Sequence, residues 1–252
     1  MQKMRSHIFV ANWKMCKNLK SSVDFVKNNH KELKELGEKN IPIVLCPSLA
    51  AIPFVVQELD NAQTFIGAQN CSGFECGAYT GETSVQPLAE VGCTFCIVGH
   101  SERRQLFNET IEEVVLKTKQ LINNKLIPII CIGETAAEHK EQQTVKILEK
   151  QLGPVLNMIK ENRSTERPFC IAYEPVWAIG TGVVPTIKKL EETFKWLQTF
   201  IGKYNIEDYA LLYGGSVNAK NSTNLKSIGF LDGFLVGGAS LDFQELKKIV
   251  LS

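Results

Sequence analysis

The stretch Phe169-Cys170-Ile171-Ala172-Tyr173-Glu174 is a short, unbroken apolar run that ends on a carboxylate. Apolar residues without alternation are typical of a strand that is covered on both faces, as in a parallel sheet. Similar runs occur at residues 8–13, 43–46, 64–69, 95–99, 127–132, 210–213 and 230–236. The sequence therefore predicts eight buried strands.

Segments with helical periodicity separate these runs. The clearest apolar faces are those of Leu19, Val23, Val26, His30 and Leu33; of Ile111, Val114, Val115, Thr118, Leu121 and Ile122; of Val145, Leu148, Leu152, Leu156 and Ile159; and of Leu190, Phe194, Leu197 and Ile201. Eight units in 252 residues average about 31 residues each, the size of a βα repeat. We expect residues 1–252 to form one α/β domain, a single parallel (β/α)8 barrel. An open doubly wound sheet is the alternative, but its G-x-G-x-x-G fingerprint after a strand is missing from the sequence.

The composition favours a globular protein with no charged partner. Lys plus Arg number 28 against 27 Asp plus Glu, so the net charge of +1 gives no basis for binding nucleic acid or an acidic membrane. No apolar run approaches the roughly 18–20 residues of a membrane span, and we expect a cytoplasmic protein. The eight cysteines are interpreted as mostly buried thiols in a reducing compartment.

Polar residues that carry chemistry follow the apolar runs. They are Asn12, Lys14, His100, Glu174, the turn Gly214-Gly215-Ser216 and the pair Gly237-Gly238. In a parallel barrel the carboxyl ends of the strands meet at one face, so these groups should share one mouth. A carboxylate, an imidazole, an ammonium group and glycine amides suit proton transfer beside a carbonyl on a small phosphorylated substrate. Taken singly, each could be a solvated charge or an ordinary turn.

Several segments resemble the signature stretches of the triosephosphate isomerase family. They are Asn12-Trp13-Lys14-Met15, Gly99-His100-Ser101-Glu102-Arg103-Arg104, Ala172-Tyr173-Glu174-Pro175-Val176-Trp177-Ala178-Ile179-Gly180-Thr181-Gly182, Tyr213-Gly214-Gly215-Ser216 and Val236-Gly237-Gly238-Ala239-Ser240. Gly77-Ala78-Tyr79-Thr80-Gly81-Glu82 resembles the family's subunit-interface loop. The resemblance covers essentially the whole chain.

The resemblance implies a TIM barrel and a homodimer. It implies the interconversion of dihydroxyacetone phosphate and D-glyceraldehyde 3-phosphate through an enediol(ate), in glycolysis and gluconeogenesis, without cofactor or metal. This family is a standard example of acid–base tuning and loop gating. By resemblance, Glu174 is the base, His100 the neutral electrophile and Lys14 the positive charge, while Asn12 positions the substrate.

The remaining site residues are also assigned by resemblance. Gly180, Ser216, Gly237 and Gly238 would hold the phosphate together with Asn12 and Lys14. Glu102 would lie beside Lys14, and Thr80, Glu82, Arg103 and Met15 would lie at the subunit interface, with an ion pair between Arg103 and Glu82. The lid would comprise Pro175, Val176, Trp177, Ala178, Ile179, Gly180, Thr181, Gly182, Val183, Val184 and Pro185.

Two positions depart from the commonest family pattern. Val183 and Pro185 stand at the second hinge of the lid, and proline fixes its own φ and restricts Val184, which predicts a hinge with fewer open states. Cys16 stands where asparagine is more common, either as a tolerated small residue or as a reactive thiol. His139 is interpreted as an ordinary surface or loop residue.

Two other function classes remain open from the residues alone. Cys71-x4-Cys76 and Cys93-x2-Cys96 could belong to a structural zinc site. Another phosphosugar-acting barrel enzyme could use the same phosphate cradle, because fold alone does not fix the reaction.

Overall fold

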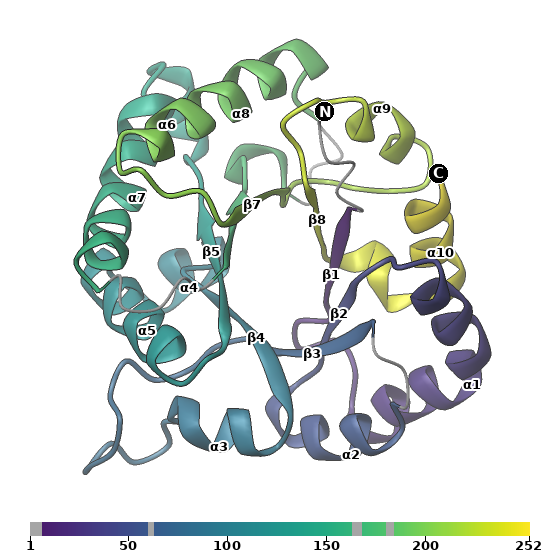
Figure 1. The fold of residues 1–252 in the computed structure, drawn as a ribbon. Coiled ribbons are helices and arrows are strands. Elements are labelled where there is room, and N and C mark those ends of the chain that lie inside the picture. The colour runs from purple at the N-terminus through teal and green to yellow at the C-terminus, as the bar shows by residue number, and fades with distance from the viewer. Residues whose placement is uncertain (1–6, 60–62, 163–167, 180–183) are drawn as a thin grey trace.

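The computed structural model describes residues 7–59, 63–162, 168–179 and 184–252. Within these ranges eight parallel strands follow one another in chain order, and β1 pairs with β8 to close a barrel (Figure 1). Helices form an outer ring around the strands, as Figure 1 shows in the view along the barrel. The predicted parallel (β/α)8 architecture is confirmed.

The strands are β1 (Ile8–Asn12), β2 (Ile43–Cys46), β3 (Thr64–Ala68), β4 (Cys93–Val98), β5 (Ile127–Ile132), β6 (Phe169–Tyr173), β7 (Tyr209–Tyr213) and β8 (Gly233–Val236). The α-helices are α1 (Leu19–Glu38), α2 (Ile52–Gln57), α3 (Val85–Glu90), α4 (Ser101–Leu106), α5 (Ile111–Asn123), α6 (Ala136–Lys140), α7 (Thr144–Glu161), α8 (Ile187–Gly202), α9 (Ser222–Lys226) and α10 (Phe243–Leu251). Short 3-10 helices are η1 (Leu49–Ala51), η2 (Val176–Ala178) and η3 (Gly238–Leu241).

Three strands begin at other residues than the apolar runs predict, and of these β7 starts only one residue earlier, at Tyr209. β4 starts at Cys93, directly after Gly92, whose φ of +96° makes the turn into the strand. β8 starts at Gly233 and not at residue 230, because Phe230 lies in a turn. A Cβ at Gly233 would lie 2.0 Å from the Ile8 carbonyl oxygen, so only glycine permits this approach of β8 to β1.

The strands separate two apolar layers. Alternate strand residues such as Val10, Cys170 and Leu212 fill the inside of the barrel, while their neighbours pack outward against the helices. The outer layer holds most of the core, including Trp13 and Phe25, whose rings meet edge to face. This alternation determines which residue at each strand end faces the mouth of the barrel.

Local signals explain how the helices begin. Thr110 and Glu113 form the predicted capping box at the start of α5, and Asn18 caps α1 through Ser21.

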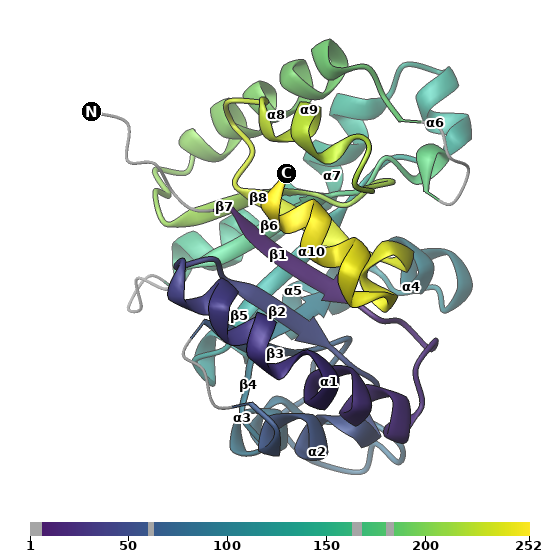
Figure 2. The same ribbon diagram turned by 90° about the vertical axis from the view of Figure 1, so that its right-hand side faces the viewer.

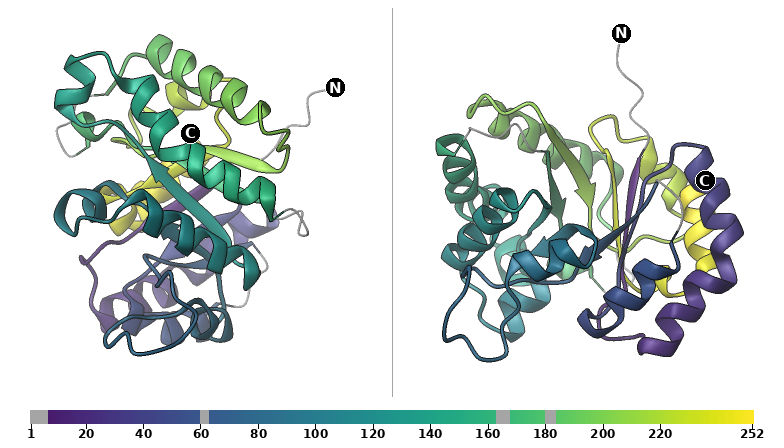
Figure 3. Two further views of the ribbon diagram at one scale, coloured as in Figure 1. Left: turned by 90° about the vertical axis from the view of Figure 1, so that its left-hand side faces the viewer. Right: turned by 60° about the horizontal axis from the view of Figure 1, so that its bottom comes forward.

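Figure 2 shows α1 and α10 lying across the outside of β1 and β2. The segment between β3 and α3 projects from the barrel in Figure 1 and again in the right-hand panel of Figure 3.

Six of the eight cysteines are buried, and Cys16 and Cys76 are exposed. Burial raises the pKa of the Cys93 thiol to about 12 and that of Cys131 well above its usual value, so these thiols stay protonated. None of the helices in the described ranges has the length and apolar character needed to cross a membrane.

Candidate active site

A cavity of about 250 Å³ opens at the carboxyl ends of the strands. Its lining comprises Asn12, Lys14, His100, Glu174, Ile179, Gly214, Gly215, Ser216, Val217, Leu235, Gly237, Gly238 and Ala239. The residues that the sequence analysis selected at the ends of β1, β4, β6, β7 and β8 therefore face one space.

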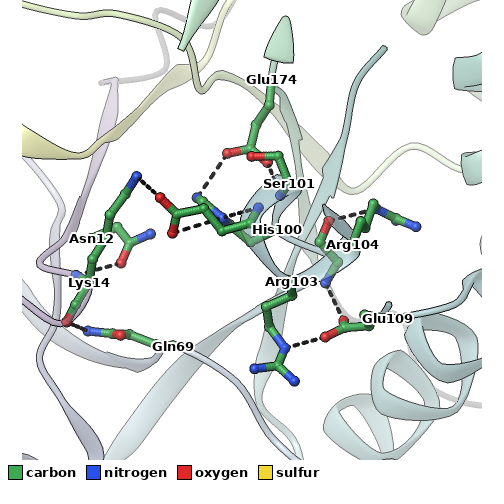
Figure 4. A network of polar contacts seen from close by, with 11 residues as sticks. Asn12, Lys14, Gln69, His100, Ser101, Arg103, Arg104, Glu109 and Glu174 are labelled. Carbon is green, nitrogen blue, oxygen red and sulfur yellow. Dashed lines mark hydrogen bonds and ion pairs between the residues drawn. The ribbon is translucent and has the colours of Figure 1, made fainter. Parts of the chain in front are cut away.

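Glu174 is the most deeply buried charged group of this cavity, with 1% of its surface exposed. One carboxylate oxygen accepts a hydrogen bond of 2.9 Å from the Ser101 backbone N–H, and the other lies 3.0 Å from His100 Nε2 (Figure 4). Gly214 leaves room for its side chain, since a Cβ there would lie 2.9 Å from Glu174 Cγ. The carboxylate is thus held beside the imidazole.

The hydrogen bonds of His100 indicate which ring nitrogen carries the proton when the ring is neutral. Its Nδ1 accepts from the Glu102 backbone N–H at 3.2 Å, as the N-cap of α4. The proton of the neutral ring therefore belongs on Nε2, which faces the cavity.

Gly99 turns His100 into the cavity. The alternation of β4 would send His100 outward with Cys96 and Val98, but Gly99 has a φ of +69° and breaks the period. Its N–H donates to Glu109 Oε1 at 2.9 Å, and its carbonyl accepts from Arg104 Nε at 2.8 Å. A turn fixed at both polar atoms gives the imidazole a defined direction.

Lys14 is held in an unusual backbone conformation, with a φ of +50°. Its N–H donates to Asn12 Oδ1 at 3.0 Å, and its carbonyl accepts from Gln69 Nε2 at 2.8 Å. Its ammonium group lies 2.5 Å from Glu102 Oε1, the partner expected by resemblance (Figure 4). These contacts aim a positive charge at the mouth of the cavity.

The cavity wall beside Lys14 offers backbone groups to an anion. Gly237 and Gly238 follow β8 and lead into η3, and an added Cβ at Gly238 would meet no atom within 4 Å. A Cβ at Gly237 would lie 3.5 Å from Lys14 Cε, so this turn lies beside the lysine. Ser216 contributes a hydroxyl that donates to the Ala178 carbonyl at 2.9 Å. The arrangement suits a phosphate near a lysine.

A buried charge cluster supports the wall behind His100. Glu109 pairs with Arg103 and with Lys117 Nζ, the latter at 3.0 Å, and Lys117 also donates to Asn70 at 3.0 Å. Burial alone would raise the pKa of Glu109, but Lys117, Arg103 and the Gly99 N–H together lower it. Glu109 therefore stays ionised and links the loop after β3 to the end of β4.

Three of the four residues expected at a subunit interface line a second cavity of about 430 Å³ beside the first. Met15, Glu82 and Arg103 line it, and Thr80 is exposed on the loop between β3 and α3. Within the chain, Arg103 pairs with Glu109, while its pairing with Glu82 of another subunit stays a prediction.

The structure describes part of the predicted lid. Pro175, Val176, Trp177, Ala178 and Ile179 directly follow Glu174 and include η2, and Pro185 is buried near the start of α8. Val184 is half-buried. Gly180, Thr181, Gly182 and Val183 lie outside the described residues, as does the predicted phosphate contact of Gly180.

Several contributors were missed by the sequence analysis. Ser101 binds Glu174 through its backbone, and Gln69 anchors Lys14, while Glu109 fixes Gly99. Ser101 could have been suspected from its place at a helix start after His100, but the other contacts join distant segments. His139, expected to be an ordinary surface or loop residue, lies on α6 and stacks on Trp177.

The structure does not favour the zinc alternative. Among the described residues, no group of three or more His, Cys, Asp or Glu side chains could hold a metal ion. Cys71, Cys93 and Cys96 are buried, whereas Cys76 is exposed on the loop between β3 and α3.

Comparisons with known proteins agree on one family. The family model described as triosephosphate isomerase matches residues 7–252. A triosephosphate isomerase of Clostridium botulinum (strain Loch Maree / Type A3) is 40% identical over 252 residues, covering 98% of this chain and 99% of the relative. Those of Endomicrobium trichonymphae and Wolbachia pipientis wMel are each 38% identical, covering 98% and 97% of this chain and 98% and 93% of theirs.

Proposed function

The chain belongs to the triosephosphate isomerase family, and from this premise we propose that Glu174, His100, Lys14 and Asn12 carry the interconversion of dihydroxyacetone phosphate and D-glyceraldehyde 3-phosphate. The observation that carries this assignment is the single cavity that holds a buried carboxylate, an imidazole Nε2 and an ammonium group, with the ammonium group beside the Gly237-Gly238 turn. This is an aldose–ketose isomerisation, in which one proton moves between adjacent carbons.

Glu174 is the base in this proposal. Its carboxylate oxygens contact the Ser101 N–H and His100 Nε2, so the carboxylate has to exchange these contacts for the substrate carbon that loses the proton. After the enediolate forms, the same carboxylate returns the proton to the neighbouring carbon. Glu174 is 1% exposed, and closure of the lid would keep water away from the carboxylate during the proton transfer.

His100 and Lys14 stabilise the oxygens. The Nε2–H of a neutral imidazole donates to the substrate carbonyl and to the enediolate oxygen that develops from it. Lys14 compensates the added negative charge, and Asn12 holds Lys14 through its side-chain oxygen. The phosphate would bind the backbone N–H groups of Ser216, Gly237 and Gly238, with the lid segment closing over it.

A coupled assay of glyceraldehyde 3-phosphate isomerisation, run without added metal or cofactor, tests the assignment. Glu174→Gln should lower kcat at least about 100-fold, because the amide cannot accept the proton. Glu207→Gln is the matched control, since Glu207 is exposed and precedes β7 at the other end of the barrel. Inactivity of the folded parent, or retained activity of Glu174→Gln, would refute it. A different phosphosugar activity in the parent would support the other barrel enzyme class.

We also propose a homodimer. The loop between β3 and α3 carries Phe74 and Tyr79, stacked with ring centroids 4.0 Å apart and both largely exposed, and Met15 is 96% exposed beside the larger cavity. Exposed apolar side chains next to a cavity are typical of an interface. The loop of each copy would enter the larger cavity of the other, bringing Thr80 near the partner's site.

Light scattering during size exclusion tests the homodimer. Tyr79→Ser should shift the mass toward the monomer, whereas Leu251→Ser, an equally exposed apolar residue on α10, should not. A monomeric parent would contradict the dimer without touching the assignment of the reaction. We further propose that residues 1–252 form one domain that acts in the cytoplasm, in glycolysis and gluconeogenesis.

A further inference from the structure

His139 on α6 lies flat against Trp177, three residues after Glu174. The ring centroids are 4.1 Å apart and the planes differ by 22°. Trp177 Nε1 donates to Glu134 Oε1 at 2.8 Å, and His139 Nδ1 lies 3.3 Å from the same oxygen. The His139 imidazole therefore contacts both the indole ring of Trp177 and the Glu134 carboxylate that accepts the indole N–H.

Glu134 makes the contact between His139 and Trp177 sensitive to charge. The residue is fully buried, and its carboxylate also accepts from the Tyr173 hydroxyl at 3.1 Å and from Thr144 Oγ1 at 3.2 Å. Burial, with Glu134 adjacent, raises the pKa of Tyr173, so the phenol stays protonated and remains a neutral donor. Among the described residues, His139 is the side chain within 4 Å of this carboxylate that can become a cation.

Trp177 is tied to the segment that carries the proposed base. The Val176 N–H donates to the Glu134 carbonyl at 3.1 Å, and the Glu174 N–H donates to the Ile132 carbonyl at 2.7 Å. These backbone contacts do not change with pH, whereas the contact of Trp177 with His139 includes a titratable group. The position of this segment can therefore depend on the charge of one imidazole.

We propose that His139 is a positioning residue that, when protonated, clamps Trp177 onto Glu134 and holds the segment from Glu174 to Ala178 where it lies in this structure. The inference rests on the proposed function, in which Glu174 leaves Ser101 to reach a substrate and this segment moves with it. An imidazolium attracts the face of the indole ring and forms a charge-assisted contact with Glu134, whereas a neutral imidazole keeps only the stacking.

The sign of the pH dependence follows from this difference. Histidines change charge between about pH 5 and 8, so acidification adds the two attractive contacts and stabilises the clamped segment. The charged neighbours of His139 on the same helix are Glu138, which accepts from Thr135, and Lys140, and Glu141 caps the end of this helix. Thr144, which α7 contributes, carries no charge. A clamped free enzyme binds substrate less readily, since only the released fraction is competent.

The clamp can be measured directly on the full-length protein. The indole Nε1–H resonance of Trp177, assigned with Trp177→Phe, should move with pH between 5.5 and 8 in the parent. His139→Phe keeps a flat ring without a charge, and its Trp177 resonance should not titrate. His139→Arg keeps a planar cation, and its resonance should stay near the acidic position of the parent. A parent resonance that does not titrate, or one that titrates equally in His139→Phe, overturns the proposal.

Kinetics supply the second readout. The ratio of kcat/KM for the parent to kcat/KM for His139→Phe should fall about two- to tenfold from pH 7.5 to 5.5, mainly because KM of the parent rises. This is the range expected for a partly exposed cation–π contact with an added ion pair. The ratio of kcat/KM for His139→Arg to kcat/KM for His139→Phe should not change with pH. If the ratio of kcat/KM for the parent to kcat/KM for His139→Phe does not change with pH, the proposed effect of His139 on the segment from Glu174 to Ala178 is wrong. An inactive parent whose indole resonance titrates would refute the isomerase assignment and leave the clamp standing.

Discussion

Gly214→Ala is the substitution that the geometry of the site constrains most sharply. An ideal Cβ at this position lies 2.9 Å from Glu174 Cγ and 3.4 Å from the Tyr173 carbonyl oxygen. Two carbon atoms approach comfortably to about 3.6 Å, so the Glu174 side chain has to shift by about 0.7 Å. The other contacts of the added methyl group are ordinary, which makes the carboxylate the group that moves.

The expected loss of activity follows from that displacement. A misplacement of about 1 Å at a reacting group can cost about 100-fold in rate, so kcat of Gly214→Ala should fall about 10- to 100-fold. KM should change less, because the phosphate wall formed by Gly237 and Gly238 is untouched. Overpacking should also lower the free energy of unfolding by about 1–3 kcal/mol.

The coupled isomerase assay, with kcat and KM determined separately, measures this effect. Circular dichroism and urea unfolding on the same samples separate a displaced carboxylate from a damaged fold. Gly229→Ala is the matched control, since its added Cβ meets no atom within 4 Å and kcat should stay unchanged. A folded Gly214→Ala with kcat within about threefold of the parent would show that Gly214 does not set the position of Glu174, contrary to the argument from distance.

Three further outcomes are expected. Glu109→Gln should lower the free energy of unfolding by about 3–5 kcal/mol at pH 7, because it leaves Lys117 unpaired in the interior. The folded-state pKa of Glu109 is lowered, so the difference between parent and variant in urea unfolding should shrink as the pH falls below about 4.5. A difference that does not depend on pH would contradict the ion pair. Pro185→Ala should raise KM about two- to fivefold through the added backbone freedom of the hinge, and unchanged turnover together with unchanged lid-exchange rates by NMR would end that hypothesis. Cys16→Asn should protect the enzyme from inactivation by iodoacetamide while Cys76→Ser, which removes the other exposed thiol, should not; undiminished sensitivity of Cys16→Asn would exclude Cys16.

The strands could be predicted from the sequence because a strand that is buried on both faces consists of consecutive apolar residues. Runs such as 127–132 and 169–173 are apolar throughout, as expected for strands of a parallel sheet that is covered by helices. The start of β8 was misplaced because Phe230 extends the apolar run, whereas the true boundary depends on the close approach of Gly233 to Ile8, a residue far away in the chain.

The candidate site was accessible to the extent that strand ends converge. Once a parallel barrel is expected, Asn12, Glu174 and Gly237 must share a face, and their place in the alternation of β1, β6 and β8 points them inward. Their proposed roles came from the resemblance to a family and not from these patterns.

Tertiary structure alone decided how the site is held. His100 faces the cavity because Gly99 breaks the alternation of β4, and that turn is fixed by Glu109, ten residues away on the segment before α5. His139 meets Trp177 because α6 packs against η2, across 38 residues of sequence. Sequence determined which side chains bury and which strands form, since hydrophobic patterns are local. The direction of each polar group depends on hydrogen bonds between distant segments, which exist only once the barrel has closed.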